Sequence, residues 1–293
     1  MKIGVLTFRS RDPEPAVEDL RLVEAAQDLG HQAVLIPTWE CSIHYNKEGE
    51  QVFWKKQPFP VLDLLIPRAR FIDYSELQLH LLEVLERQMP VLNRARAVSF
   101  AKNKIKTLQL LSAAGLPMPA SLVLEDASQL PAAVESLGGF PLVLKTPYGT
   151  FGEGVSLVHS SQEAQDIFDH QIFPQLIAQE FIEEAAGKDA RLFVANGTVL
   201  AAMERQAQAG EFRSNIELGA TATVLDPSQE LKDLACKAVA ALGLDYAGVD
   251  VVHSKRGPLI LEVNANAGFK MLEQVSGVDI ASVLISGSSQ SHQ

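Results

Sequence analysis

Residues 141–155 read PLVLKTPYGTFGEGV, and this glycine-rich stretch between two predicted strands decides how the chain is interpreted. Gly149, Gly152 and Gly154 let backbone N–H groups approach a ligand without an intervening Cβ, and successive N–H groups can bind phosphate. The spacing matches neither a Walker A loop nor a dinucleotide fingerprint. Lys145 ends an apolar strand, where a lysine needs a charged partner. An ordinary glycine-rich hairpin is the alternative, but Lys145 favours a loop that holds nucleotide phosphates.

A second pattern lies near the C-terminal end, where acidic and amide residues interrupt two apolar runs. Glu262 and Asn264 share one face of LILEVNAN at 259–266, and Asp250 interrupts AGVDVV at 247–252. A hairpin turn centred near Arg256 places Asp250 opposite Glu262, with Cβ atoms about 5 Å apart. Two carboxylates at that distance repel each other, and Mg²⁺ ions bound through oxygen atoms would explain the pair. The alternative is an exposed sheet face with scattered polar residues.

Around these patterns, short apolar runs alternate with helical periodicity, which predicts an α/β protein with a parallel sheet at its N-terminal end. We expect an N-terminal α/β domain at 1–95 and a central subdomain with the glycine loop at 96–178. A C-terminal subdomain with the carboxylates is expected at 179–286, and a disordered tail at 287–293. Asp226 and Pro227 predict the start of a helix at 227–242. Ser161 is expected to cap the helix that follows it. Residues 41–60 are expected to form a polar excursion between elements.

Composition limits the classes of function. The chain has 293 residues, of which 47% are hydrophobic and 21% charged, and this excludes wholesale disorder. A net charge of −11 argues against nonspecific nucleic-acid binding by the overall surface, although residues 93–106 carry five basic residues and no acidic one. Cys41 and Cys236 are too few for a disulfide framework or a zinc cluster. Apolar runs of about 18 residues are absent from the sequence, so we expect a cytoplasmic protein without membrane contact.

Taken together, the segments resemble the ATP-grasp superfamily and, within it, the RimK group of glutamate ligases. The resemblance is carried by AKNKIKTLQLLSAAGL at 101–116, by the glycine stretch, by QEFIEEAAGKDAR at 179–191, by EFRSN at 211–215 and by GPLILEVN at 257–264. It implies an ATP-grasp fold, in which an N-terminal Rossmann-like pre-ATP-grasp domain with a parallel sheet precedes two α+β subdomains that sandwich ATP.

The resemblance also implies a set of residues that contact the nucleotide: Lys104, Lys145, Gly149, Gly152, Gly154, Glu180, Phe181, Asp189, Arg213, Ser214 and Asn215. Within it, Glu180 and Phe181 would line the adenine slot and Asp189 would hold the ribose. Arg213 and Lys145 would supply positive charge where negative charge builds up in catalysis. From the residues alone, a surface ion pair of Asp189 with Arg191 remains open.

By the same resemblance, Asp250, Glu262 and Asn264 would bind two Mg²⁺ or Mn²⁺ ions. The implied reaction is ATP-dependent amide formation, in which a carboxylate attacks the γ-phosphate and an amine then attacks the acyl phosphate. L-Glutamate would be the amine, and the acceptor would be the C-terminus of a protein or peptide, such as small-subunit ribosomal protein six. Arg68, Arg70 and the basic stretch 94–106 would suit an acidic tail.

Several alternatives stay open for substrate and function. Segments 8–16, 67–70 and 264–268 depart from the pattern of the family, and they lie where an acceptor is expected. Related branches act on amino-group carrier proteins, coenzyme tails or small peptides. A non-catalytic ATP-binding regulator and a nucleic-acid-associated protein are the rivals from other classes, and the complete Asp250, Glu262 and Asn264 set favours catalysis. The resemblance also implies a homo-oligomer, either a dimer or a tetramer.

Overall fold

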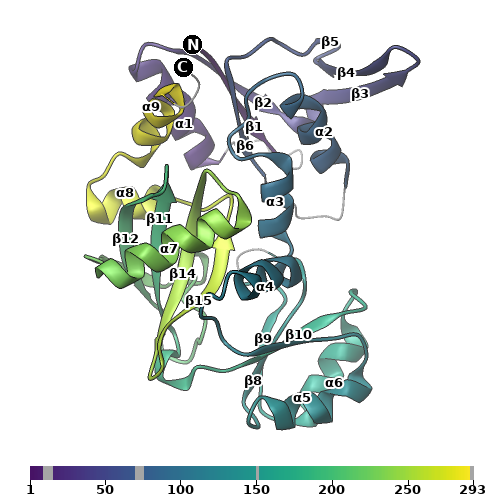
Figure 1. Ribbon diagram of the computed structural model, residues 1–293, viewed down its shortest axis with the longest axis vertical. Coiled ribbons are helices and arrows are strands. Elements are labelled where there is room, and N and C mark those ends of the chain that lie inside the picture. The colour runs from purple at the N-terminus through teal and green to yellow at the C-terminus, as the bar shows by residue number, and fades with distance from the viewer. Residues whose placement is uncertain (9–15, 70–75, 150–151, 291–293) are drawn as a thin grey trace.

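The computed structural model describes residues 1–8, 16–69, 76–149 and 152–290 (Figure 1). In these ranges the chain forms four β-sheets with helices packed against them. Short 3-10 turns lie at η1 (Thr38–Glu40), η2 (Ala127–Gln129), η3 (Glu183–Ala185) and η4 (Ile216–Leu218). Among the helices of the described ranges, none combines the length and the apolar character needed to cross a bilayer.

The N-terminal part is a parallel sheet, as the short apolar runs predicted. Its strands pair in the order β2-β1-β6, and they are β1 (Lys2–Thr7), β2 (Gln32–Pro37) and β6 (Leu64–Arg68). Helices α1 (Val17–Asp28) and α2 (Glu76–Glu86) follow β1 and β6. Strands covered on both faces need continuous apolar sequence, and residues 3–7 are all buried. The strands β1 and β6 end at Thr7 and Arg68, on the edge where such sheets bind ligands.

The expected excursion at 41–60 is instead a small antiparallel sheet, so that prediction was wrong. Its strands are β3 (Cys41–Asn46), β4 (Gly49–Trp54) and β5 (Gln57–Pro58). The sheet projects from one side of the N-terminal part (Figure 1). Val52 is its one fully buried strand residue, so the sheet shows little of the apolar alternation that predicts a strand. The indole of Trp54 donates to Glu40 at 2.8 Å and fixes the base of the hairpin.

The central part begins with two short helices, α3 (Ala95–Lys102) and α4 (Lys104–Ala113), which meet at Asn103. The Asn103 side chain accepts from the backbone N–H of Lys106 and caps α4. An antiparallel sheet follows, in the order β7-β10-β8-β9, with α5 (Leu130–Ser136) and α6 (Ser161–His170) packed on one face. Its strands are β7 (Ser121–Leu124), β8 (Leu142–Lys145), β9 (Val155–Val158) and β10 (Leu176–Glu180).

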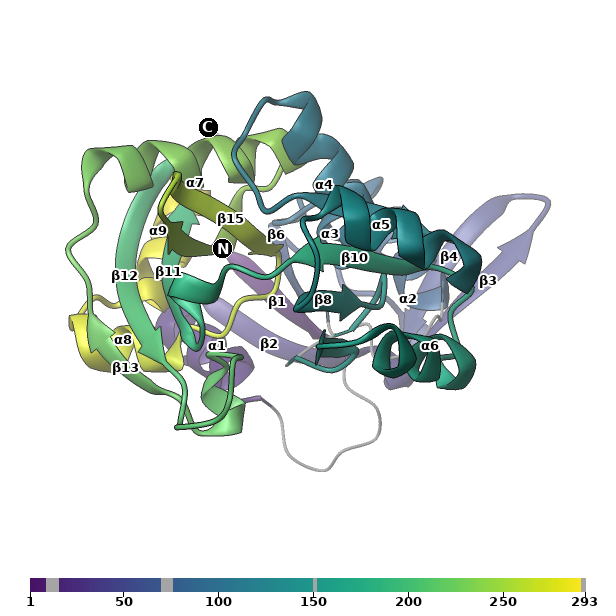
Figure 2. The same cartoon turned by 90° about the horizontal axis from the view of Figure 1, so that it is seen from below.

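The C-terminal part is a larger antiparallel sheet in the order β13-β12-β11-β14-β15. Its strands are β11 (Lys188–Ala195), β12 (Thr198–Gln206), β13 (Thr221–Val224), β14 (Tyr246–Ser254) and β15 (Gly257–Asn264). Helix α7 (Gln229–Leu242) packs on one face, and α8 (Lys270–Ser276) and α9 (Ile280–Gln290) pack on the other side. Figure 2 shows this sheet on one side and the sheet of β8 and β10 on the other, with the N-terminal sheet behind them.

Three predicted boundaries differ from the structure. Helix α7 begins after Ser228, whose hydroxyl accepts from the N–H of Leu231, so Asp226 and Pro227 lie outside the helix. Ser160 rather than Ser161 caps α6, by accepting from Glu163. Helix α9 continues to Gln290, into the segment expected to be disordered, and 291–293 lie outside the described residues. The proposed divisions after residues 95 and 178 remain predictions.

Candidate active site

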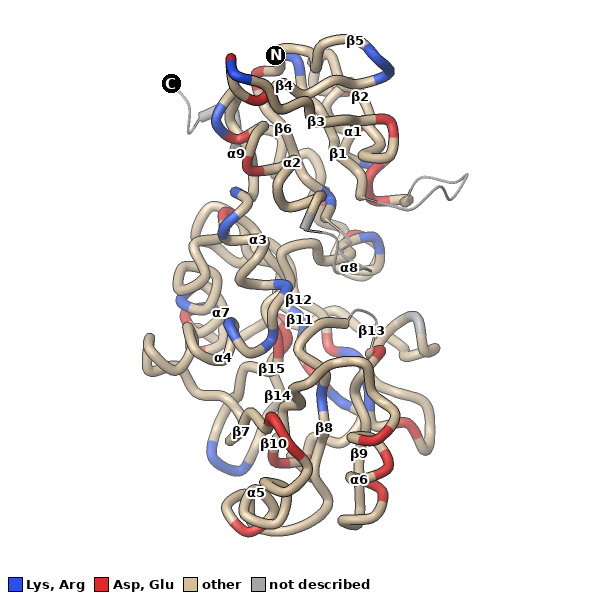
Figure 3. Tube along the Cα trace, turned by 90° about the vertical axis from the view of Figure 1, so that its right-hand side faces the viewer, with Lys and Arg blue, Asp and Glu red and all other residues tan. Residues whose placement is uncertain are grey.

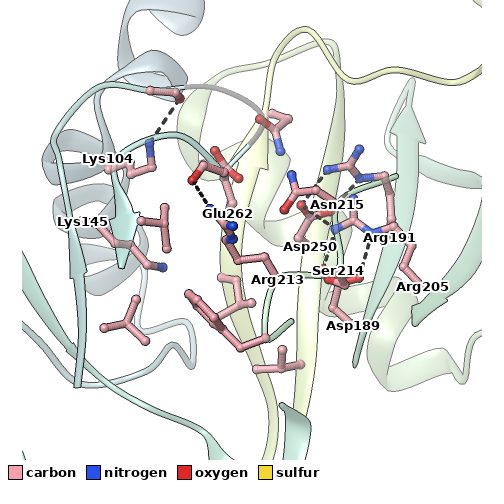
Figure 4. Close-up of a pocket in the computed structure, with 18 of the residues that line it drawn as sticks. Lys104, Lys145, Asp189, Arg191, Arg205, Arg213, Ser214, Asn215, Asp250 and Glu262 are labelled. Carbon is pink, nitrogen blue, oxygen red and sulfur yellow. Dashed lines mark hydrogen bonds and ion pairs between the residues drawn. The ribbon is translucent and has the colours of Figure 1, made fainter. Parts of the chain in front are cut away.

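A cavity lies between the β7-β10-β8-β9 sheet and the larger C-terminal sheet, and it reaches the N-terminal part of the chain (Figure 4). Its lining comes from α1, β6, the α3–α4 junction, β8, the glycine loop and the strands of the C-terminal sheet. Of the residues that the sequence assigned to nucleotide and metal, Gly154 is the exception that does not line the cavity. The structure therefore brings the other predicted residues together around one cavity.

Strand alternation explains why polar side chains point into this cavity. On β11, Ala190, Leu192 and Val194 pack in the cluster that contains α7, so Asp189 and Arg191 point to the opposite face. The same alternation applies to β14, where Val249 and Val251 pack toward α7. Asp250 lies between these two valines and therefore faces the cavity. One face of the sheet thus packs against α7, and the other carries these charges beside the cluster that packs against α8 and α9.

Asp250 and Glu262 lie directly opposite each other on β14 and β15, as predicted. In this structure two arginines compensate the charge of Asp250. Arg191 donates to both of its oxygens at 2.7 Å, and Arg205 donates to one of them at 3.0 Å. Burial acts to raise the pKa of Asp250, but the two guanidinium groups outweigh it and lower the pKa to about 2. Asp250 is therefore a fixed anion in the cavity wall.

The predicted metal ligands fit a hard divalent cation by the chemistry of their donors. Asp250, Glu262 and Asn264 present two carboxylates and one amide oxygen on one face of β14 and β15. Mg²⁺ prefers such oxygen ligands and commonly shares them with phosphates. Within the described ranges, no three His, Cys, Asp or Glu side chains gather closely enough to hold a metal. The pair of carboxylates would need phosphate oxygens to complete a metal site. To bind the metal, an oxygen of Asp250 would have to give up its hydrogen bond from Arg191.

Asp189 does not form the surface pair with Arg191 that the sequence left open. It lies directly across β11 and β12 from Arg205, and Arg205 donates to both of its carboxylate oxygens, through Nε at 2.7 Å and through one Nη. The side chains of Arg205 and Asp189 are 3% and 4% exposed. The sequence analysis missed Arg205. A hairpin drawn about Asn196-Gly197 would place Glu204 opposite Asp189, and a register shift between Phe193 and Val194 brings Arg205 there instead. A ribose hydroxyl at Asp189 would have to share an oxygen with Arg205.

Lys104 and Lys145 lie on the same side of the cavity (Figure 4). Desolvation lowers the pKa of Lys145, Glu262 acts in the opposite direction and the charge of Lys104 lowers it, with a net pKa of about 8. The Lys104 ammonium donates to the carbonyl of Gly149 at 3.2 Å, and its backbone N–H donates to Pro147 at 2.9 Å. Figure 3 shows the basic segments of α3 and α4 near the middle of the molecule. These lysines could hold an anion at the base of the glycine loop.

The glycine loop is held by its first and last residues. Gly149, Gly152 and Gly154 all have positive φ, and the N–H of Thr146 donates to the carbonyl of Gly154 at 2.8 Å. A Cβ on Gly154 would lie 2.0 Å from the hydroxyl oxygen of Thr146, so this position excludes larger residues. Gly154 therefore shapes the loop rather than lining the cavity. Thr150 and Phe151 lie outside the described residues.

Arg213 connects the glycine loop to the opposite wall of the cavity. It donates to the carbonyl of Gly152 at 3.1 Å and, through Nε and one Nη, to the carboxylate of Glu211 at 2.9 and 2.8 Å. These hydrogen bonds from Arg213 lower the pKa of Glu211 to about 2. Ser214 is buried beside it, and the amide oxygen of Asn215 faces Gly152. The three residues of the predicted Arg-Ser-Asn segment thus all meet the loop or the cavity.

The predicted adenine slot has an apolar wall and a polar rim. Phe181 contacts Phe212 edge to face, with ring centroids 6.3 Å apart, and both line the cavity. Glu180 accepts from the backbone N–H of Ala120 at 2.7 Å and from Arg256 at 2.6 Å, so its carboxylate is already bound. Phe212 was missed in the sequence, although it adjoins the predicted Arg213. Flat apolar walls of this kind suit a planar base.

Arg68 lies at the far end of the cavity and is buried, and its proposed contact with an acidic tail remains a prediction. Its Nε donates to Asp19 at 3.0 Å, and its guanidinium lies 5.5 Å from the ring centroid of Phe269. Arg70 lies outside the described residues. Arg68 therefore anchors the N-terminal part to the C-terminal sheet.

Comparison with known proteins places this fold and cavity in a family. Family models match residues 1–99, as a RimK PreATP-grasp domain, and residues 101–287, as a RimK-like ATP-grasp domain. A relative from Aeromonas salmonicida, named a probable alpha-L-glutamate ligase, is 37% identical over 289 residues, which cover 97% of this chain and 95% of the relative.

Two solved structures show the same fold. A RimK domain ATP-grasp protein from Sphaerobacter thermophilus matches with a TM-score of 0.75 and 24% identity over 98% of both chains. The ATP-grasp ligase PsnB, complexed with a phosphomimetic variant of its minimal precursor, Mg and ADP, matches with a TM-score of 0.73 and 20% identity, over 99% of this chain and 98% of PsnB.

The fold and the cavity are those of an ATP-grasp ligase, an enzyme class that uses ATP to form carbon–nitrogen bonds. Because the two family models together span nearly the whole chain, the protein belongs to the RimK-like ATP-grasp family. The resemblance inferred from the sequence is thereby confirmed, and so is the expected fold of a pre-ATP-grasp domain followed by two α+β subdomains.

Proposed function

We propose that this protein is an ATP- and Mg²⁺-dependent carboxylate–amine ligase that adds L-glutamate to the C-terminal carboxylate of a protein or peptide. The observation that carries the proposal is the cavity shared by two opposed sets of residues. Lys104, Lys145 and the glycine loop line one side of it, and the opposed carboxylates of Asp250 and Glu262 line the other. The name of the relative from Aeromonas salmonicida supports L-glutamate as the amine.

Positioning and charge would do most of the catalytic work, because phosphoryl transfer needs little covalent help from a protein. The acceptor carboxylate would attack the γ-phosphorus to give an acyl phosphate and ADP. The amine would then attack the acyl carbon and release phosphate. Lys104 and Lys145 would hold the phosphates from one side, and Arg213 would approach from the other. Asp250, Glu262 and Asn264 would hold two Mg²⁺ or Mn²⁺ ions, which when bound neutralise phosphate charge.

The contact between Arg213 and the glycine loop supports a role in excluding water. The carbonyl of Gly152 accepts from Arg213 at 3.1 Å, so the loop is tied across the cavity to the C-terminal sheet. An acyl phosphate hydrolyses readily when water reaches it, and a closed loop protects it.

The proposed acceptor carries an acidic C-terminal tail, such as that of a ribosomal protein. Arg94 and Arg96 are exposed on a segment without acidic residues, and such a segment attracts an acidic chain. PsnB was solved with a precursor, and the macrocyclase MdnC with a precursor peptide, which makes a peptide acceptor reasonable here. Carrier proteins, coenzyme tails and small peptides belong in the same screen. By resemblance to the family we propose a cytoplasmic dimer or tetramer.

The test is ADP release with ATP and Mg²⁺, screened over amino acids with and without acidic-tailed acceptors, followed by mass spectrometry of the acceptor. We expect ADP release that depends on glutamate, with stepwise glutamyl additions. Glu262→Gln should abolish turnover, and Glu204→Gln, which alters a carboxylate on the exposed pair with Lys188, should not. ATP binding without turnover in every mixture would refute the proposal and favour a regulatory protein.

A further inference from the structure

The end of the cavity nearest the N-terminal sheet carries polar groups that the phosphate chemistry does not use. Glu18 of α1 and Arg68 of β6 line it together with Asn266 and Gly268, which follow β15. This end belongs to the same cavity as Asp250 and Glu262. A second substrate that must reach the acyl phosphate could therefore enter here.

The charges at this end do not cancel. Arg68 is committed to Asp19, with its Nε donating to that carboxylate at 3.0 Å, and both side chains are almost completely buried. Its two outer nitrogens share the single carbonyl of Ala267 at 3.4 Å. Glu18 has no ion pair or hydrogen bond with any of the described residues. Among the described residues at this end, Arg68 forms its close ion pair with Asp19, and the carboxylate of Glu18, which acts on Arg68 only at longer range, carries a further negative charge.

Two acceptors at this end lack a hydrogen-bond partner among the described residues. The side-chain carbonyl of Asn266 is buried and lacks a hydrogen-bond partner among the described residues. A carboxylate and an amide carbonyl can accept hydrogen bonds but cannot donate them. A buried acceptor without a partner is costly, so a ligand that donates would be stabilised here. The carboxylate of Glu18 and the side-chain carbonyl of Asn266 therefore favour a cation with several N–H groups.

Gly268 keeps the carboxylate of Glu18 accessible. A Cβ built on Gly268 would lie 3.1 Å from Oε1 of Glu18, which is tighter than ordinary contact. The φ of Gly268 is not positive, so alanine can adopt its backbone conformation. Substitution by alanine would therefore crowd the carboxylate without removing its charge.

We propose that Glu18 and Asn266 form the subsite for the ammonium group of the incoming amino acid, and that Arg68 acts indirectly by neutralising Asp19. The inference rests on the proposed ligase function and adds to it the residues that bind the amine. The ligand class is a free α-amino acid that brings a primary ammonium group to the cavity.

The test compares binding of L-glutamate with binding of glutarate, which has the same two carboxylates but lacks the ammonium group. Isothermal titration with Mg²⁺ and ADP present is expected to show L-glutamate binding roughly tenfold or more tightly than glutarate, since a charged hydrogen bond contributes that much. Glu18→Gln should remove this preference, and Gly268→Ala should weaken it. Glu24→Gln, on an exposed position of the same helix, is the matched control. An unchanged preference in folded Glu18→Gln would overturn the inference.

A separate readout judges the ligase reaction itself. Hydroxylamine is mostly uncharged near neutral pH and can trap an acyl phosphate as a hydroxamate without an ammonium subsite. Glu18→Gln should form hydroxamate from ATP and a glutamate-ended peptide at the wild-type rate, while its KM for L-glutamate rises roughly tenfold or more. Absence of hydroxamate from the wild-type protein would count against the ligase function. The binding comparison would still decide the role of Glu18.

Discussion

Replacing Arg205 with methionine would remove a charge that lies between two buried carboxylates. Its Nε donates to Asp189 at 2.7 Å, and one of its Nη atoms lies 3.0 Å from Asp250. Methionine preserves much of the length of the side chain, so the main loss is electrostatic. Asp250 keeps both bonds from Arg191, and the effect therefore falls on Asp189.

The expected loss is large because Asp189 is 4% exposed and would keep a charge without a partner. Breaking one side of a buried pair costs about 3–5 kcal/mol in the free energy of unfolding. Burial raises the pKa of Asp189, and loss of Arg205 would raise it further. A carboxyl whose pKa is higher in the folded state destabilises the protein when ionised. The deficit of the variant should therefore shrink as the pH falls and Asp189 takes up a proton.

The assay is urea unfolding of the protein without nucleotide, followed by circular dichroism. The matched control is Lys188→Met, which breaks the neighbouring pair of Lys188 with Glu204 on the same two strands. Those side chains are 51% and 37% exposed, so the control should cost about 0.2–1 kcal/mol. The reasoning is refuted if Arg205→Met unfolds at the same urea concentration as Lys188→Met.

Three further predictions concern the site. Glu262→Gln should reduce metal-dependent ADP release by at least about a hundredfold while leaving the circular dichroism spectrum unchanged, because it removes a charge that the metal needs; wild-type turnover would contradict it. Because the pKa of Lys145 is about 8, ATP binding at about pH 9 should be accompanied by uptake of a proton, and it should weaken as the pH rises further. Calorimetric titrations in buffers of different ionisation enthalpy measure this proton uptake, and Lys145→Met should abolish it. Proton release instead would exclude Lys145 from the phosphate site. Gly154→Ala should destabilise the protein in urea by about 1–3 kcal/mol more than Gly115→Ala, since the two glycines have φ of +68° and +66° but Gly154 alone meets Thr146; equal losses would contradict this.

Local sequence indicated the pair of Asp250 and Glu262 because both lie in one hairpin. The turn pairs β14 with β15, and a register shift between Asp250 and Val251 completes the alignment that sets Asp250 opposite Glu262. The glycine pattern and Lys145 could be recognised for the same reason, because Lys145 ends β8 and the glycines lie in the short loop that leads to β9.

The rest could not be predicted because it depends on pairing between distant strands. Arg191 meets Asp250 through the register of β11 with β14, 59 positions apart in sequence. The pairing of Arg68 with Asp19 likewise joins residues 49 positions apart in sequence. In such cases the sequence specifies which residues are charged, while the fold decides which of these charges neutralise each other.

The most direct test of the account follows one oxygen atom through the reaction. An acidic peptide labelled with oxygen-18 in its C-terminal carboxylate is incubated with ATP, Mg²⁺, L-glutamate and the wild-type protein, and the products are analysed by mass spectrometry. Passage through an acyl phosphate transfers one labelled oxygen to the inorganic phosphate, and the account predicts this result together with ADP and a peptide extended by glutamate. Label in AMP, or extension of the peptide with unlabelled phosphate, would contradict it.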